Sequence, residues 1–218
     1  MDQSTFVTRV AARLNIDSSD PMYPFLDEYV NEGLHYLETA SPEGFPWMTQ
    51  TVTLTTVAND RDYTFAALGL LTSNSASVTR VKDCSILYMG TQWVALDLIN
   101  PESADLEYGD SRGSLPQAWF AEGQTLYLYP TPDAAYSVRV RCVTVEPDLG
   151  GAASTPVLPV VFHQAVIDAA LLVCYQQLQD SSRMETTQGK VDQWVDRMKR
   201  YGAEYANAPR VTVRDPLN

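Results

Sequence analysis

The two histidines are the residues of this chain best suited to chemistry, because an imidazole can serve as acid, base or metal ligand. His35 follows Glu32 by three positions, and Glu-x-x-His on a helix supplies half of a di-iron carboxylate site. His163 would have to supply the other half, but Val160 stands where the matching carboxylate is needed. We therefore expect no metal site. We expect His35 to be a half-exposed helix residue and His163 to hydrogen-bond a carbonyl group.

The three cysteines carry thiols, but their positions do not favour catalysis or cross-linking. Cys84, Cys142 and Cys174 lie far apart, and no Cys-x-x-Cys pair is present. His163 precedes Cys174 by eleven residues on one predicted helix, a separation of about 16 Å, so they cannot form a nucleophile pair within it. We expect all three to be small core residues. Scattered thiols of odd number are typical of a reducing cytoplasm.

Sequence motifs of the common enzyme classes are missing as well. The chain has neither a Gly-x-Ser-x-Gly elbow nor a glycine-rich nucleotide loop. Its many acidic residues include no pair that their spacing singles out as a glycosidase dyad. These observations predict a binding or structural protein without enzymatic activity, cofactor or metal.

The composition predicts a globular chain with an acidic surface. The 218 residues include 15 basic and 27 acidic side chains, for a net charge of −12, which disfavours general binding to nucleic acid. Residues 1–110 hold 16 of the acidic and 5 of the basic side chains. The chain contains no run of eighteen apolar residues, the length that could span a membrane. Its first residues lack the pattern of a signal peptide.

Helices are expected at both ends of the chain. Apolar residues recur at three- and four-residue spacing in Thr5–Leu14, with Ser4 as the expected N-cap, and again from Leu26 to Leu37. Towards the C-terminus, Val160–Leu178 is apolar on nearly all faces, which predicts burial on most sides. An amphipathic helix follows, with its apolar stripe between Val191 and Tyr205.

Strands are expected in the middle of the chain. From Trp47 to Val145 the apolar period is mostly two, with turn signals every eight to twelve residues, which predicts an antiparallel sandwich or small barrel. Trp119–Tyr129 is the clearest hairpin, with its turn at Glu122-Gly123. The other expected strands are Thr49–Val57, Tyr63–Phe65, Val78–Met89, Trp93–Leu98 and Tyr136–Val145.

The order of these elements predicts an α+β fold. Because the two helices at each end are too few to bury their own apolar stripes, we expect the N- and C-terminal helices to form one helical bundle. An antiparallel β-sandwich or barrel-like domain is then inserted between them, and an extended tail follows. The predicted boundaries are 1–46 and 147–206 for the two parts of the bundle, 47–146 for the β-domain and 207–218 for the tail.

Several short phrases carry a family resemblance. The segment RVAARLN at 9–15 precedes the second helix, LYPTPD at 128–133 follows the hairpin, and Leu158-Pro159 with Phe162-His163 opens the C-terminal helices. In this layout the chain resembles the head–tail connector (adaptor) proteins of tailed bacteriophages. The resemblance implies a structural protein of the virion neck, made in the host cytoplasm, without enzymatic activity. It also implies a dodecameric ring that docks beneath the portal and extends the DNA channel.

The resemblance implies partners too: further copies of the chain, the portal protein, and stopper, tail-terminator or tail tube proteins. DNA would pass through the lumen without specific binding, since an acidic wall repels phosphate. The tail is basic and β-branched, and we expect it to reach the portal or a neighbouring subunit by adding a strand. A frayed terminus is the alternative. The tail residues are Arg210, Val211, Thr212, Val213 and Arg214.

A second interpretation rests on the aromatic residues of the middle segment. A carbohydrate- or receptor-binding virion module would present two or three exposed rings on one face, whereas a connector keeps them packed. A hydrolase with an acid pair is a third interpretation, and it predicts a cleft with perturbed carboxylate pKa values. The aromatic residues concerned are Trp47, Trp93, Trp119, Tyr127 and Tyr129.

Overall fold

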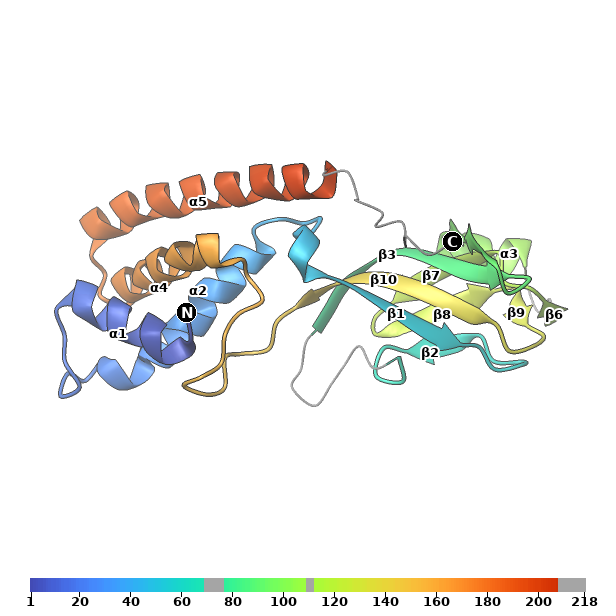
Figure 1. Ribbon diagram of the computed structural model, residues 1–218, viewed down its shortest axis with the longest axis horizontal. Helices are drawn as coiled ribbons and strands as arrows, with labels where there is room; N and C mark the ends of the chain where they lie inside the picture. The colour runs from blue at the N-terminus through green and yellow to red at the C-terminus, as the bar shows by residue number, and fades with distance from the viewer. Residues whose placement is uncertain (69–76, 109–111, 208–218) are drawn as a thin grey trace, which may run out of the picture. The chain divides into compact units, whose positions relative to one another are not determined.

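Helices occupy both ends of the chain and strands its middle, so the fold is α+β. The computed structural model (Figure 1) describes residues 1–68, 77–108 and 112–207. The chain divides into two compact units: a helical unit of residues 1–47 with 151–218, and a β-unit of residues 48–150. Within the described part, no helix is long and apolar enough to cross a membrane.

In the helical unit the helix α4 lies at the centre. It contacts α1, α2 and α5, which explains why its residues are buried on nearly every face. The prediction of a helix covered on most sides is thereby confirmed. The four helices are α1 (Gln3–Leu14), α2 (Leu26–Thr39), α4 (His163–Gln177) and α5 (Ser181–Asn207). Single 3₁₀ turns precede three elements: η1 (Tyr23–Phe25), η2 (Pro46–Met48) and η3 (Val160–Phe162).

Two details at the helix starts differ from the sequence analysis. Ser4 is not the N-cap of α1, because the Asp2 carboxylate takes this role and accepts the Thr5 backbone N–H at 2.9 Å. Ser4 lies inside the first turn, and its hydroxyl donates to Asp2. Val160 and Val161, at the start of the predicted apolar run, are not buried with its central residues. They lie in η3, ahead of α4, and are 76% and 62% exposed.

A glycine sets the close contact between α2 and α4. A Cβ atom on Gly33 would lie 2.6 Å from the backbone nitrogen of Ala170. Only a residue without a side chain allows the two backbones to approach this closely. Gly33 is therefore a packing residue of the α2–α4 contact.

The β-unit contains two four-stranded sheets with the strand orders β1-β10-β3-β4 and β2-β8-β7-β5. The first sheet is antiparallel throughout. Its strands are β1 (Thr49–Thr55), β3 (Ser77–Tyr88), β4 (Gln92–Ala95) and β10 (Ser137–Val145). The second contains β2 (Asp62–Thr64), β5 (Asp97–Leu98), β7 (Ala118–Glu122) and β8 (Thr125–Tyr129), and a small pair is formed by β6 (Arg112–Ser114) and β9 (Thr131–Pro132).

The expected hairpin is confirmed, but an antiparallel barrel-like domain is not. β7 and β8 pair antiparallel, with Glu122 opposite Thr125 and Trp119 opposite Leu128. In the described residues the sheets do not close into a barrel, and β5 pairs with β7, and β6 with β9, in parallel. A parallel pair needs a long crossover, and the chain between β5 and β7 supplies one that includes the helix α3 (Pro101–Glu107).

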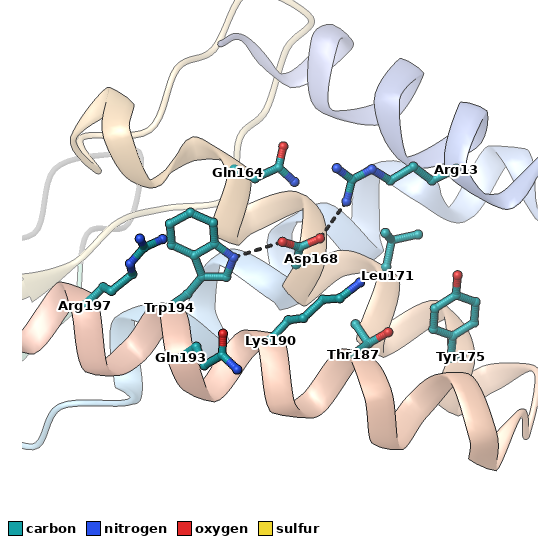
Figure 2. Close-up of a pocket in the computed structure, with 10 residues that line it drawn as sticks. All are labelled: Arg13, Gln164, Asp168, Leu171, Tyr175, Thr187, Lys190, Gln193, Trp194 and Arg197. Carbon is teal, nitrogen blue, oxygen red and sulfur yellow. Dashed lines mark hydrogen bonds and ion pairs between the residues drawn. The ribbon is translucent and has the colours of Figure 1, made fainter.

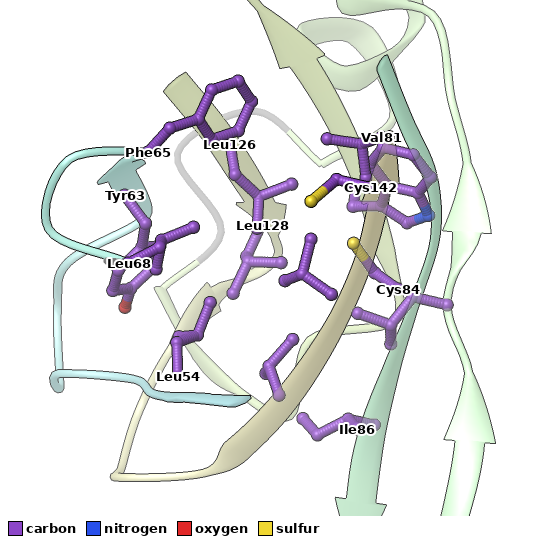
Figure 3. Packing of buried hydrophobic residues seen from close by; sticks show 14 residues of the cluster. Leu54, Tyr63, Phe65, Leu68, Val81, Cys84, Ile86, Leu126, Leu128 and Cys142 are labelled. Atoms are coloured by element: carbon purple, nitrogen blue, oxygen red, sulfur yellow. The ribbon is translucent and has the colours of Figure 1, made fainter. Parts of the chain in front are cut away.

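The main core of the β-unit draws on both sheets (Figure 3). Leu54 and Val140 come from the first sheet, and Leu126 and Leu128 from the second. Cys84 and Cys142 lie in this core with 0% exposure, as the sequence predicts. A smaller cluster beneath α3 contains Ala104, Ala118, Phe120 and Tyr129.

Candidate functional site

A pocket of about 570 Å³ in the helical unit is lined by side chains of α1, α4 and α5 (Figure 2). Leu171 and Tyr175 of α4 and Thr187 of α5, all buried, form part of its wall. The exposed cations Arg13, Lys190 and Arg197 also line it. We call this hollow the basic pocket.

Asp168 joins the three helices around the basic pocket. Its carboxylate accepts a hydrogen bond from Arg13 Nη1 at 2.6 Å and another from the indole N–H of Trp194 at 2.9 Å. The residue is only 6% exposed, and burial of a carboxylate is costly unless the charge is paired and hydrogen-bonded. Arg13 and Trp194 meet this requirement, so α1 and α5 are held on α4 by one side chain.

Gln164 reinforces the contact one turn before Asp168. With its amide oxygen turned towards α1, it accepts hydrogen bonds from Arg13 Nη1 at 3.2 Å and Nη2 at 2.9 Å. A guanidinium group presents its donors in a fixed fork, so the two acceptors fix the direction of the Arg13 side chain.

The other two cations of the basic pocket, Lys190 and Arg197, are not paired with a carboxylate of the described residues. The Arg197 guanidinium stacks 5.1 Å from the centre of the Trp194 ring. The single lining acid, Asp168, is already bound to Arg13. On a chain of net charge −12, this pocket is a local excess of positive charge suited to a carboxylate-bearing ligand.

The histidines occupy the places that the sequence predicts. The Nδ1 atom of His163 lies 2.6 Å from the N-terminal ammonium group, and its Nε2–H donates to the Leu158 carbonyl at 3.1 Å. Burial and the nearby ammonium group lower the pKa of His163. The side chain of His35 is 34% exposed, with Nδ1 3.3 Å from Glu38 Oε2. Among described residues, no three His, Cys, Asp or Glu side chains gather as metal ligands would.

All three cysteines are free and buried. Desolvation raises the pKa of Cys142 to about 11 and that of Cys174 to about 12, and it raises the pKa of Cys84 further. A thiolate is the nucleophilic form of cysteine. The three side chains therefore serve as core residues, as expected from the sequence.

Aromatic side chains of the β-unit pack mostly in its interior. Trp119 and Tyr129 are each 3% exposed, and Phe120 stacks 4.6 Å from the Tyr127 ring. Trp93 is covered by the guanidinium group of Arg139 at 3.9 Å. Among the described aromatic residues of this unit, only Tyr88 is exposed, at 42%. These rings do not form a shared exposed face.

The segment that the sequence analysis singles out for partner binding, Arg210–Arg214, lies outside the described residues. The basic pocket, in contrast, was not found from the sequence. One signal for it was present: Asp168 is the only charged residue between Val160 and Leu178. A lone carboxylate in a helix buried on most sides requires a partner, although the sequence does not show which.

The comparison with protein families concerns almost the whole chain. The family model described as SU10 adaptor protein matches residues 1–214. The chain belongs to the SU10 adaptor protein family. No curated protein matches it.

Membership of the SU10 adaptor family makes the chain a structural adaptor protein of a bacteriophage. The resemblance to phage head–tail adaptors is thereby confirmed. The match includes the helical unit with its basic pocket, the β-unit and the segment 210–214. The basic pocket lies within the helical unit of this adaptor and combines buried apolar side chains with exposed cations.

Proposed function

We propose that this SU10 adaptor forms a ring beneath the portal of a tailed bacteriophage, extends the DNA channel and joins the head to the tail or stopper. The observation that carries the proposal is the family match over residues 1–214. The ring is a dodecamer that matches the portal. It belongs to the neck of the virion, and the protein is made in the host cytoplasm.

In this proposal each copy has a helical unit and a β-unit and contacts its neighbours, the DNA and the docking partners. The helical unit is a bundle, the β-unit is a sandwich, and each copy buries one flank against the next in a closed ring. The net charge of −12 supports a lumen that repels phosphate, so DNA passes without specific binding. Docking partners are the portal on one side and stopper, tail-terminator or tail tube proteins on the other.

The proposed role is not catalytic. Two properties of the described residues support this. The thiols are buried with raised pKa values, and both ring nitrogens of His163 are engaged in hydrogen bonds. The three thiols and His163 are therefore not available to a substrate in this state.

The basic, β-branched segment Arg210–Arg214 is proposed to bind the portal or a neighbouring copy by strand addition. A variant truncated after Asn207 tests this part. We expect it to keep its fold, because the interactions that hold α5 on α4 lie before the cut, and to lose most of its affinity for the portal. Unchanged binding would reject the role of the segment.

The alternative, a carbohydrate- or receptor-binding module, predicts several exposed rings on one face of the β-unit. Trp119, Tyr129 and Phe120 are buried instead, which favours the connector. A glycan array with the purified protein tests the alternative directly.

Co-sedimentation with purified portal from the same phage tests the connector proposal. The adaptor alone should stay near the top of a density gradient and should move with the portal after mixing. A portal from an unrelated phage is the control. If the adaptor does not move with its own portal at any ratio, the proposed docking is wrong.

A further inference from the structure

The basic pocket is built for an occupant with two chemical properties. Its buried wall includes Leu171 and Tyr175, which suit an apolar side chain, and its exposed cations Lys190 and Arg197 suit carboxylates next to it. Charge-assisted hydrogen bonds to such carboxylates are stronger than neutral ones. A protein segment with an exposed apolar residue between acidic residues meets both needs.

The chain itself carries such a segment on α3. Ala104 is fully buried and Tyr108, just after the helix, packs beside it in the cluster beneath α3. Glu102 and Leu106, four residues apart, share the opposite face of this helix. Leu106 is 90% exposed, the highest value among the large apolar side chains that the structure describes, and Glu102 and Glu107 are exposed as well.

A second acidic segment fits the basic pocket less well. Phe25 lies in η1, shortly before Asp27 and Glu28, but half of its surface is already covered. Leu106 has nearly its whole side chain available for burial, so docking it removes more apolar surface from water. Phe25 is therefore the comparison site in the experiments below.

We propose that the basic pocket receives Leu106 and its flanking glutamates from α3 of a neighbouring copy of the chain. This inference rests on the proposed ring and names a contact that builds it. Each copy has one pocket and one such α3 face on different units, so the contact is heterologous and can repeat around a closed ring. The positive pocket and the negative α3 face select each other by charge.

Disulfide trapping between two different variants tests the contact. Leu106→Cys places a thiol on α3 of one chain, and Gln193→Cys places one at the basic pocket of another. The native thiols are buried, so little background is expected. Mixing the two variants under mild oxidation should give a covalent dimer on a non-reducing gel.

Two control pairs define what the trapping result means. Leu98→Cys replaces a 68% exposed leucine of the same β-unit, and Phe25→Cys reports on the second acidic segment. Paired with Gln193→Cys, both should give far less dimer than Leu106→Cys. Equal dimer yields from all pairs would overturn the proposal. So would a double variant with both Leu106→Cys and Gln193→Cys that forms its disulfide only within one chain.

Charge reversal provides a second test with a matched lysine. Lys190→Glu should raise the protein concentration needed for ring assembly by about tenfold or more, because it places like charges opposite each other. Lys199→Glu changes the same charge on an exposed residue of α5 outside the basic pocket and should have a much smaller effect. Adding Glu102→Lys to Lys190→Glu should restore part of the loss.

The outcomes separate this inference from the proposed function. If the wild type forms rings on its portal and both Lys190→Glu and Leu106→Gln do so equally well, the pocket contact is wrong and the connector proposal stands. If the trapping pair links two copies but no form binds the portal, the contact stands and the portal role is wrong.

Discussion

Arg13 and Asp168 lie 155 positions apart in the sequence, and their side chains form an ion pair with 2.6 Å between Nη1 and Oδ1. The pair fixes the first helix of the chain to a helix that follows the whole β-unit. Trp194 donates to the other oxygen of the same carboxylate. The helical unit is therefore closed by a polar contact as well as by its apolar core.

Replacing Arg13 with Met should lower the free energy of unfolding by about 1 kcal/mol. The change leaves the buried Asp168 carboxylate without its cation, but Arg13 is 44% exposed on its side chain, and solvent screening limits the loss. Urea unfolding followed by tryptophan fluorescence measures it. Arg9→Met, at an exposed residue of the same helix, is the matched control, and an equal loss there would contradict the role of the pair.

Two glycine substitutions in helices should have opposite effects. Gly33→Ala should destabilise the protein by about 1–3 kcal/mol, since its Cβ would meet backbone atoms of α4 that cannot move aside. Gly189→Ala has open space around the new Cβ and should stabilise the protein by about 0.5–1 kcal/mol through helix propensity. Thermal unfolding of the two variants checks the signs. Similar behaviour of both would show that the α2–α4 contact is looser than described.

Stability should fall as the pH drops below the ordinary pKa of histidine, about 6.5. The pKa of His163 is lowered in the fold by burial and the nearby ammonium group. The unfolded chain then binds more protons than the folded one between the lowered and the ordinary pKa, so acid favours unfolding in that window. His163→Phe removes this group, and its melting temperature should change less between pH 7 and pH 5. An unchanged slope would assign the acid sensitivity to other residues.

Native thiols should be unreactive until the protein unfolds. All three are buried, and desolvation raises the pKa of Cys142 and Cys174 to about 11 and about 12. A coloured thiol reagent at pH 8 should report almost no free thiol in the folded protein and all three cysteines in urea. Rapid labelling of the native protein would show that one of the cores opens readily.

The sequence predicts an element correctly where residues close together in the chain determine its structure. The hairpin of β7 and β8 was predicted from alternation and the Glu122-Gly123 turn, and the central helix from its apolar run. The sequence alone does not decide which residue caps α1, because Asp2 and Ser4 are both good caps. The helix α3 is not among the elements predicted from the sequence, although Asn100 and Pro101 form a typical helix start.

The parallel pairs and the basic pocket depend on contacts between distant parts of the chain. β5 is only two residues long and pairs with β7 across a crossover, which leaves no periodic signal. Arg13, Asp168 and Trp194 come from three helices, and nothing in one segment indicates the others. The family resemblance, in contrast, can be recognised from the sequence, because it depends on short sequence segments and on their order along the chain.

The number of adaptor copies bound to one portal shows whether the chain forms a closed ring there. Native mass spectrometry of the portal before and after mixing measures this number. We expect a gain of about 290 kDa, which is the mass of a dodecamer of 24.2 kDa chains, with no partly filled rings at saturation. A portal that gains no mass, or gains scattered single copies without a closed number, would contradict it.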